Sequence, residues 1–274
     1  LKAVFETSLK NQLELITVVA SKKVIKSISK QLKYADAESL RIIDVELGSD
    51  SILGKADKKN SPYVIECLNK AADLAHKEKI SLVTGPINKK IISDTVTGFS
   101  GHTEFLKEKF RCEDVLMLLA NNSLKVGVAT THVALKDVPS MITKELIIKK
   151  CKLLSQGLKD IYGLSDTKIA VLGLNPHAGE GGSFGTEEIA QIKPAINDLN
   201  KEGLGIVGPI SADTAFIDQN YDAYLSMYHD QALPVLKTLD FHHSVNITLG
   251  LPIHRISVDH GTAEDIAPKL VADY

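Results

Sequence analysis

Short runs rich in valine and isoleucine alternate along the chain with longer amphipathic stretches, and this alternation limits the possible folds more than any other feature. The runs predict strands at residues 80–84, 115–119, 125–131, 168–173, 222–228, 244–249 and 253–258. Apolar residues at helical spacing predict helices that begin at Ser61-Pro62, at Thr143 and just after Thr186. Strands that alternate with helices in this way are typical of an α/β fold with a largely parallel central sheet.

The length and charge of the chain exclude several classes of protein. Its 274 residues, 44% of them apolar, are enough to bury one large core or two modest ones, and a net charge of −2 is unlike that of a disordered chain. So small a net charge argues against nucleic acid or an anionic membrane as the main partner. The apolar runs are far shorter than the ~20 residues of a membrane-spanning helix.

The N-terminal residues and the cysteines indicate the compartment. Residues 1–7 have neither the basic and apolar regions of a secretion signal nor the Arg-rich pattern of a transit peptide. The three cysteines are widely spaced and odd in number, which argues against a disulfide framework. We therefore expect a cytoplasmic protein.

Three histidines each follow a different predicted strand. His132 comes after 125–131, His177 after 168–173 and His229 after 222–228. Ligands of open α/β sheets bind outside the carboxyl ends of the strands, so these side chains could converge on one crevice. Three imidazoles that leave a coordination position open are typical of a catalytic divalent metal. The alternative is that each histidine caps a strand end and binds only backbone.

The residues next to these histidines are small or polar. His177 lies in a turn with four glycines, residues 175–185, which either lets backbone N–H groups approach an anion or is a plain flexible turn. Its glycine spacing is one residue too long for the dinucleotide-binding fingerprint. Asp230 directly follows His229, where it could be a further ligand, a partner that orients an imidazole, or a helix N-cap.

Two other stretches and three late residues are suited to binding phosphate or carboxylate. The stretches are 84–90, with two lysines, and 99–105, which places an imidazole and a hydroxyl at the start of a predicted helix. Lys237, Asn246 and Arg255 lie on or beside strand ends, and an arginine can bind a phosphate bidentately. Taken singly, each of these residues is better explained as a surface or structural group.

Eight motifs, taken in order, resemble the signatures of the 4-hydroxythreonine-4-phosphate dehydrogenase family, the NAD-dependent enzymes of vitamin B6 biosynthesis. The motifs are residues 84–89, 101–105, 131–139, 173–182, 212–214, 227–231, 245–252 and 257–263. The resemblance implies a homodimer with a two-lobed fold like that of isocitrate and isopropylmalate dehydrogenases, with largely parallel central sheets and a cleft between the lobes. Residues 1–97 plus 247–274 would form a cofactor-binding lobe, and residues 98–246 a lobe for metal binding and dimerisation.

The resemblance also implies roles for individual residues. The family's metal ligands fall on His132, His177 and His229. Its substrate-binding positions fall on His102, Thr103, Lys237, Asn246 and Arg255. The cofactor-binding loop of the wider dehydrogenase class is similar to the stretch that contains His260, Gly261, Thr262, Ala263 and Asp265. Lys237 and Asp230 are the candidates for the catalytic base.

The implied reaction is the oxidation of 4-phosphohydroxy-L-threonine at C3 by NAD or NADP, followed by decarboxylation to 3-amino-2-oxopropyl phosphate. It would need one divalent metal, with zinc, magnesium, manganese and cobalt all compatible. Three alternatives stay open. The chain could be a paralogue that oxidises 4-phosphoerythronate or 4-phosphothreonate, a metal-dependent hydrolase or lyase that uses the same histidines, or a non-catalytic phosphate-binding protein.

The chain also departs from the family pattern. The usual opening of the form G-[DE]-P-x-G-[IV]-G is absent from residues 1–30, and Pro268 replaces a glycine. Residues 216–221 look several residues short, His254 stands at a position that is usually apolar, and the expected terminal helix is missing after Tyr274. We therefore expect that segments flanking the cofactor and substrate cleft are absent from this sequence.

Overall fold

The computed structural model describes residues 1–7, 11–34, 37, 39–217 and 220–271, and the chain divides into two compact units. Unit 1 comprises Leu1–Phe105 and His260–Tyr274, and unit 2 comprises Leu106–Asp259. The expected two-lobed α/β class is confirmed. Part of the segment 216–221, which looked short in the sequence, and the last three residues lie outside the described residues.

Unit 1 is mainly helical, with three short strands. Its elements are α1 (Lys2–Phe5), β1 (Thr17–Ala20), α2 (Lys22–Leu32), β2 (Arg41–Asp44), α3 (Ser61–Glu78), β3 (Leu82–Thr84) and α4 (Lys89–Ser93), with α5 (His102–Lys109) beginning in it. β1 and β2 pair in parallel along their whole length. Short 3₁₀ turns occur at Leu13–Leu15, Lys58–Asn60 and Ala267–Lys269.

Unit 2 is built on one mixed sheet. Its strands are β4 (Leu116–Ala120), β5 (Lys125–Thr130), β6 (Lys168–Leu172), β7 (Gly205–Ile210), β8 (Ala223–Tyr228), β9 (Val245–Leu249) and β10 (Arg255–Val258). Within unit 2 they are ordered β10-β9-β4-β5-β8-β6-β7. The half β5-β8-β6-β7 is parallel, whereas β10, β9, β4 and β5 pair antiparallel. The carboxyl ends of the four parallel strands therefore share one edge of the sheet.

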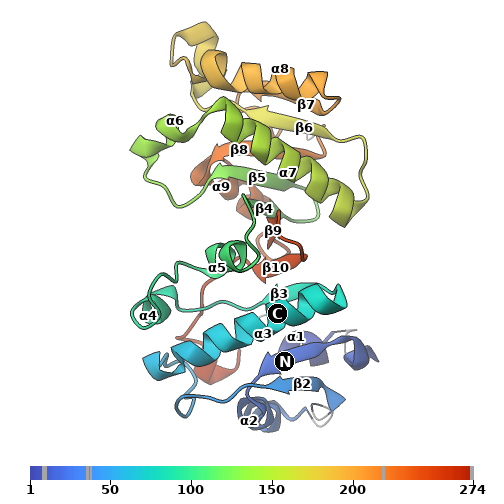
Figure 1. Ribbon diagram of the computed structural model, residues 1–274, viewed down its shortest axis with the longest axis vertical. Helices are drawn as coiled ribbons and strands as arrows, with labels where there is room; N and C mark the ends of the chain where they lie inside the picture. Colours follow the sequence, from blue (N-terminus) through green and yellow to red (C-terminus); the bar gives the residue numbers. More distant parts are fainter. Residues whose placement is uncertain (8–10, 35–36, 38, 218–219, 272–274) are drawn as a thin grey trace. The chain divides into compact units, whose positions relative to one another are not determined.

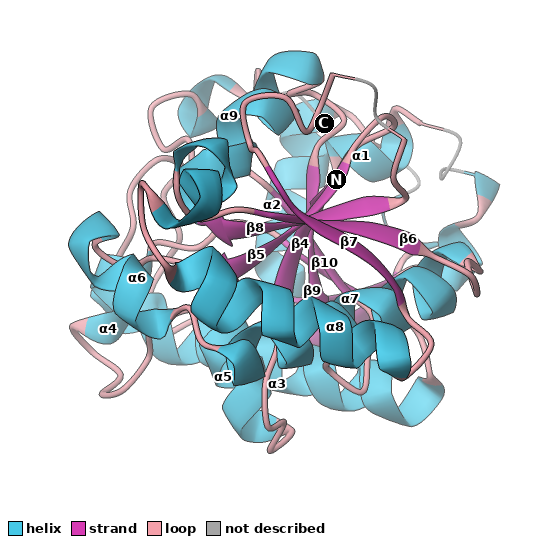
Figure 2. Cartoon of the chain, turned by 90° about the horizontal axis from the view of Figure 1, so that it is seen from above, coloured by secondary structure: helices cyan, strands magenta, loops and turns pink. Residues whose placement is uncertain are grey.

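Helices cover both faces of this sheet. The helices of unit 2 are α6 (Val138–Met141), α7 (Lys144–Tyr162), α8 (Lys193–Lys201) and α9 (His229–Leu239), with short turns η5 (Leu135–Asp137), η6 (Pro176–Gly182) and the π-helical η7 (Glu188–Ile192). α7 and α8 pack on one face and α9 on the other (Figures 1 and 2). Alternate residues of β4 serve the two cores, because Leu116 and Leu118 join the α7 side and Leu119 the α9 side.

The longest helix illustrates how local sequence sets the elements. The Thr143 hydroxyl accepts a hydrogen bond from the Leu146 backbone N–H at 3.1 Å, which caps the start of α7. Gly163 ends the helix in the left-handed conformation that glycine favours. Leu154 and Leu158, which are fully buried, lie on the face that packs against the sheet. Of the helices in the described ranges, none is both long enough and apolar enough to cross a bilayer.

The sequence predictions identify most of these elements. All seven predicted strands are present, within two residues at most ends, and the three predicted helices correspond to α3, α7 and the η7–α8 segment. The strands β1, β2 and β7 were not predicted. The division into units also differs from the predicted one, which placed residues from 247 onward in the first lobe. β9 belongs to unit 2 because it pairs with β4 from Leu116 to Ala120.

A buried lysine fixes α7 to the start of β4. Lys150 is only 7% exposed, and its Nζ donates hydrogen bonds to Asp114 Oδ1 at 2.8 Å and to the Val115 carbonyl at 2.7 Å. Burial raises the pKa of the Asp114 carboxyl, but the hydrogen bond and charge of Lys150, together with the Val115 backbone N–H and Lys107, lower it more, so this pKa lies below its usual value. The pair therefore contributes to stability only while Asp114 is ionised.

Replacing Lys150 by methionine should reduce the free energy of unfolding by about 1–2 kcal/mol at pH 7, after allowance for the solvent that reaches Asp114. Because the folded pKa of Asp114 is depressed, its stabilising effect is present above the unfolded pKa of about 3.9 and is lost as the pH falls through the folded value. The gap between wild type and variant should thus narrow below about pH 4. Urea unfolding at several pH values would measure it.

The matched control is Lys149→Met on the same helix. Lys149 forms an exposed ion pair with Glu113, so its loss should change stability little. Equal losses in the two variants, or a gap that does not depend on pH, would contradict the role given to Lys150.

Candidate active site

Two of the histidines singled out in the sequence lie side by side at the carboxyl edge of the unit 2 sheet. β5 and β8 are parallel neighbours with Thr130 opposite Tyr228, so the residues that follow them emerge together. His132 lies two residues beyond β5, and His229 opens α9 directly after β8. Their ring centroids are 6.1 Å apart at an interplanar angle of 37°. This is the convergence that the strand-end argument predicted for these two residues.

Asp230 sets the orientation of the His229 ring. Its Oδ1 lies 2.7 Å from Nδ1 of His229, which leaves Nε2 as the nitrogen available to a ligand. A carboxylate in this place stabilises one tautomer and fixes the orientation of the ring. Of the three roles considered for Asp230, orientation of the imidazole matches this contact.

Gln231 ties the His229 segment to the end of β6. Its Oε1 accepts the backbone N–H of Met227 at 2.7 Å, and its Nε2 donates to the Gly173 carbonyl at 2.6 Å. One amide side chain thus connects the end of β8 with the segment that leads to His177. The sequence analysis assigned no role to this residue, although it stands two positions after His229.

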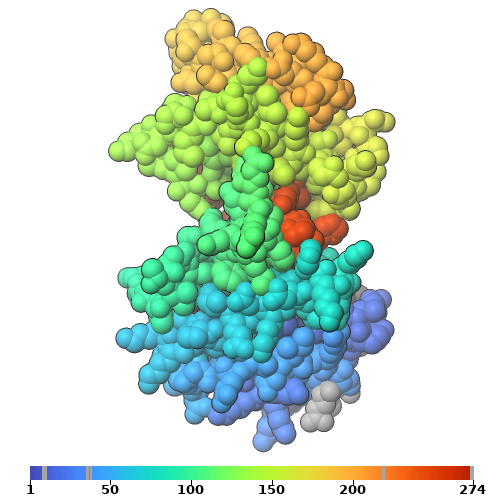
Figure 3. Space-filling model, in the orientation of Figure 1, coloured from blue at the N-terminus to red at the C-terminus, as the bar shows by residue number. Residues whose placement is uncertain are grey.

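His177 begins a turn with an unusual backbone. Every residue from His177 to Gly182 has positive φ, at 52°, 51°, 81°, 41°, 66° and 101° in order. His132 also has positive φ, at 51°. Left-handed backbone is uncommon for residues other than glycine, and such residues concentrate at functional sites because the surrounding structure must hold them. Figure 3 shows the segment around this turn as a gold projection beside α8.

A pocket of about 620 Å³ lies at the same edge of unit 2. Segments that follow β6, β7 and β8 line it, including His177, Asp213, Tyr228 and Asp230. The Ser211 hydroxyl donates to Asp213 Oδ1 at 2.6 Å, and this bond, with a smaller effect of nearby His177, holds the pKa of the Asp213 carboxyl below its usual value. Asp213 was quoted in the sequence only as part of a motif, because β7, the strand that positions it, was not predicted.

The donors at this edge partly match a metal site. Two imidazoles that bind one ion through nitrogens at about 2.1 Å would have ring centroids roughly 5–6 Å apart, close to the spacing of His132 and His229. The ring of His177 instead lies 6.3 Å from that of Phe184. Within the described ranges, no three His, Cys, Asp or Glu side chains of one chain gather closely enough to hold a metal ion. The structure therefore brings together two of the three expected ligands.

The substrate residues expected from the sequence fall on both units. In unit 2, Lys237 Nζ forms an ion pair with Asp259 Oδ2 at 2.9 Å. Arg255 is only 4% exposed, and its Nη1 donates to the Thr248 hydroxyl at 3.1 Å. Asn246 lies on β9, and its buried Oδ1 has no hydrogen-bond partner among the described residues, so it can accept one from a ligand.

The other expected substrate residues, and all those expected to bind the cofactor, lie in unit 1. His102 and Thr103 open α5 and are both partly buried. In the 260–265 stretch, His260 Nδ1 lies 2.8 Å from the Gly261 carbonyl, and Ala263 has a φ of 47°. The Thr262 hydroxyl bonds to Glu264, and Asn88 Nδ2 also donates to Glu264 Oε1, at 3.0 Å. Asp265 continues the same loop.

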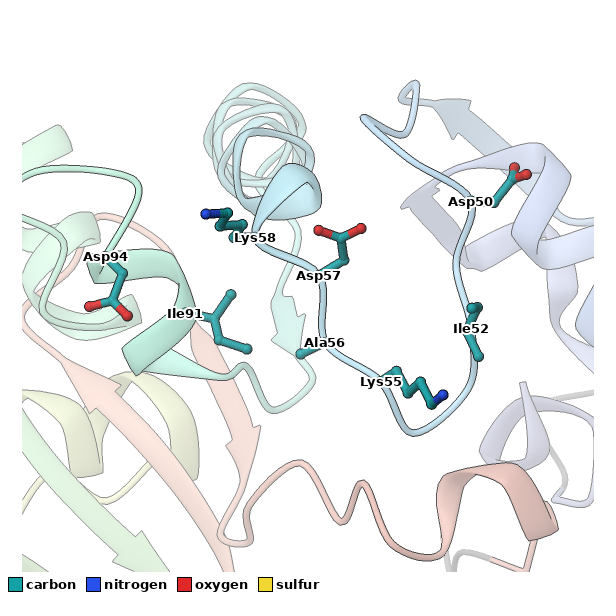
Figure 4. Close-up of a pocket in the computed structure, with 8 residues that line it drawn as sticks. All are labelled: Asp50, Ile52, Lys55, Ala56, Asp57, Lys58, Ile91 and Asp94. Atoms are coloured by element: carbon teal, nitrogen blue, oxygen red, sulfur yellow. The ribbon is translucent and has the colours of Figure 1, made fainter.

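Unit 1 has a pocket of its own, with a volume of about 490 Å³ (Figure 4). Lys55, Lys58 and Asp57 line it on one segment, and Ile91 and Asp94 line it from α4 and the residue that follows. The turn that carries Lys55 touches the 260–270 segment, since a Cβ on Gly54 would lie 2.5 Å from the Glu264 carbonyl oxygen. The sequence analysis did not single out this pocket.

Comparisons with known proteins agree with the resemblance noted in the sequence. A 4-hydroxythreonine-4-phosphate dehydrogenase from Yersinia enterocolitica is 48% identical over 241 residues, which cover 86% of this chain and 73% of the relative. One from Serratia proteamaculans is 46% identical over the same shares. The crystal structure of a 4-hydroxythreonine-4-phosphate dehydrogenase from Klebsiella pneumoniae matches with a TM-score of 0.84 at 31% identity, covering 94% of this chain and 84% of that one. The family model described as pyridoxal phosphate biosynthetic protein PdxA matches residues 3–274. The chain belongs to this family, the pyridoxal phosphate biosynthetic protein PdxA family.

Proposed function

We propose that this chain oxidises 4-phosphohydroxy-L-threonine at C3 with NAD or NADP and that the resulting 3-keto acid loses CO2 to give 3-amino-2-oxopropyl phosphate. The names of the relatives support this substrate and reaction class. The observation that carries the proposal is the pair of imidazoles, His132 and His229, at the carboxyl edge of a parallel sheet beside a polar pocket. Such a constellation suits metal-assisted chemistry on a small polar substrate.

We further propose that His132, His177 and His229 hold one divalent ion of zinc, magnesium, manganese or cobalt. The spacing of His132 and His229, and the orientation of the latter by Asp230, support this. When bound, the ion would act as a Lewis acid that favours the ionised C3 hydroxyl and withdraws electrons from the carbonyl that replaces it. Because His177 lies apart from the other two, a second copy of the chain could complete the ligand set.

The proton transfers would fall to Lys237 and Asp230. One of them accepts the C3 hydroxyl proton as hydride leaves C3 for the nicotinamide ring. Loss of CO2 then leaves an electron pair on C2, and a proton delivered there completes the product. The ion pair with Asp259 holds the Lys237 ammonium in one place, and the Asp230 carboxylate is accessible, with a side chain that is 82% exposed.

We propose separate sets of residues for the phosphate and for the cofactor. His102, Thr103 and Arg255 offer an imidazole, a hydroxyl and a guanidinium, all of which donate to phosphate oxygens, and Asn246 offers its unpaired amide oxygen to an N–H or O–H group of the substrate. For the cofactor we propose the loop of His260, Gly261, Thr262, Ala263 and Asp265. This loop contacts the turn that carries Lys55, which also lines the unit 1 pocket together with a second lysine and three aspartates.

We propose a homodimer that works in the cytoplasm. Large apolar side chains are exposed in the segments that follow β5 and β6, namely Leu135, Met141, Phe184 and Ile189. Exposed apolar groups in this number commonly mark an interface. The three cysteines are free thiols, as expected in a reducing compartment.

The test is NADH formation by the metal-loaded protein with 4-phosphohydroxy-L-threonine and, in parallel, with 4-phosphoerythronate, each with and without a chelator. We expect turnover of the threonine derivative that disappears with chelator and returns on addition of metal. The product, measured by mass spectrometry, should have lost CO2.

Other outcomes of this assay would favour a different function for the chain. Turnover of 4-phosphoerythronate alone would make the chain a sugar-acid phosphate dehydrogenase. Turnover that resists a chelator would refute the metal assignment while keeping the dehydrogenase. No NADH with either compound, although metal and substrate both bind, would refute the dehydrogenase itself.

A further inference from the structure

The left-handed turn after His177 needs support from outside itself. Three of its six residues, His177, Ala178 and Glu180, carry side chains, for which a left-handed backbone is unfavourable. Residues in such conformations persist only where their surroundings hold them. The part of the structure that contacts the turn is therefore informative about how His177 is held.

The support is a buried carboxylate. Glu188 is 1% exposed and opens the π-helical turn η7, an element that often occurs at functional sites. Its Oε1 accepts the Asn175 backbone N–H at 2.7 Å, and its Oε2 accepts Asn175 Nδ2 at 3.0 Å. Burial raises the pKa of the Glu188 carboxyl, but the hydrogen bonds from Asn175 lower it more, so the group stays ionised at neutral pH.

The glycines around the turn leave room for this carboxylate. A Cβ on Gly179 would lie 2.6 Å from Glu188 Oε2, and one on Gly173 would lie 3.3 Å from Oε1. A Cβ on Gly185 would lie 2.3 Å from Asn175 Nδ2 and 2.6 Å from Glu187 Oε2. A side chain at Gly179 would thus collide with the Glu188 carboxylate, and one at Gly185 would collide with Asn175, which that carboxylate holds.

We propose that Glu188 is a positioning residue, whose carboxylate fixes Asn175 and the left-handed turn and thereby the direction of His177. Asn175 stands two residues before His177, with only Pro176 between them, so the place where Asn175 is held decides where the turn begins. The inference rests on the proposed function, in which His177 acts at the carboxyl edge.

This inference also explains the glycine pattern that the sequence left open between an anion-binding turn and a flexible one. The turn does approach an anion closely, but the anion is the protein's own carboxylate. Two of the three glycines whose spacing departs from the dinucleotide fingerprint, Gly179 and Gly185, accommodate side chains of the protein itself, namely Glu188 at the first and Asn175 and Glu187 at the second.

The test is Glu188→Gln. Glutamine has nearly the same size as glutamate, but one carboxylate oxygen becomes an NH2 group. In either orientation of the amide, this NH2 group faces a hydrogen-bond donor of Asn175. We expect the backbone amides of 177–182 to exchange with solvent roughly tenfold faster or more, because the turn opens more often. The imidazole NMR signals of His177 should shift, and kcat should fall by about 10–100-fold with a smaller change in KM.

Ile196→Val is the matched control. Ile196 is 4% exposed on α8, and its truncation perturbs the same core without touching the turn, so it should leave exchange at 177–182, the His177 signals and kcat as in wild type. If Glu188→Gln does not fold, Asn175→Ala removes the Nδ2 bond to Glu188 Oε2 but keeps the backbone bond to Oε1, so it should show the same pattern more mildly. The double variant should lose less than the sum of the two single variants, because the two side chains share the bond from Asn175 Nδ2 to Glu188 Oε2.

The outcomes separate this inference from the proposed function. Unchanged exchange and unchanged His177 signals in Glu188→Gln would overturn it, and so would faster exchange with an unaltered kcat. A wild-type protein that turns over neither substrate would refute the proposed function, yet the exchange rates and the His177 signals would still decide whether Glu188 positions the turn.

Discussion

A His229→Ala variant is expected to lose NADH formation by at least roughly 10²–10³-fold, the range seen when one preorganised electrostatic group is removed from an active site. His229 is the better choice among the paired histidines because its backbone is helical and suits alanine, whereas His132 has a left-handed backbone that is already unfavourable. The loss should appear in kcat together with a weaker affinity for zinc or cobalt, measured by calorimetry.

His243→Ala provides the control for this variant. His243 is an exposed histidine bonded to Asp240 at the end of α9, and no role is assigned to it. Its removal should leave turnover and metal affinity unchanged. If His229→Ala keeps its metal affinity while losing turnover, the imidazole acts on the substrate rather than on a metal, and the three-histidine site is refuted.

A Leu249→Ala variant is expected to lose about 3–4 kcal/mol of unfolding free energy, which is typical of a buried leucine removed from a packed core. Leu249 is 4% exposed on β9 and packs directly on α7. A Cβ added to Gly157 of that helix would lie 2.5 Å and 2.6 Å from its two Cδ atoms. The leucine therefore fills the space that the glycine leaves, and urea unfolding followed by circular dichroism would measure the loss.

The same geometry predicts a change of sign in a double-mutant cycle. Gly157→Ala in the wild type should destabilise by about 1–3 kcal/mol, because the added methyl group overpacks the site. In the Leu249→Ala background the same change should stabilise, since the methyl group enters the cavity and alanine favours the helix. Additive effects of the two substitutions would show that the two residues do not share this space.

Strong local patterns made most of the unit 2 fold predictable. β5, β6 and β8 are continuous apolar runs because they are buried on both faces, and α7 carries both a capping threonine and a terminal glycine. The sequence could not show β7, whose two glycines and one proline resemble a turn, nor β1 and β2, which are four residues each. Those strands are defined by pairing with distant partners rather than by local pattern.

The candidate site, like the fold, was predictable where it depends on local sequence patterns and not where it depends on distant partners. Strand order brings His132 and His229 together, and the position of each at a strand end was visible in the sequence. The direction of His177 was not, because it depends on backbone conformation and on Glu188, which is eleven residues away. Asp213 was missed with the strand before it, and Gln231 because its partners Met227 and Gly173 come from two different strand ends.

In the parallel half of the unit 2 sheet, the histidines lie at the carboxyl edge, and connecting segments lie at the opposite, amino edge. The connections 163–167 and 202–204 lie at the amino ends of β6 and β7, so the five residues of β6 keep them about 17 Å from the histidine edge. Ser165 and Asp166 in the first of these connections are exposed. A tether inserted there would attach the protein to an electrode or a bead with the histidine edge facing the solution, so that immobilisation would leave the proposed site open.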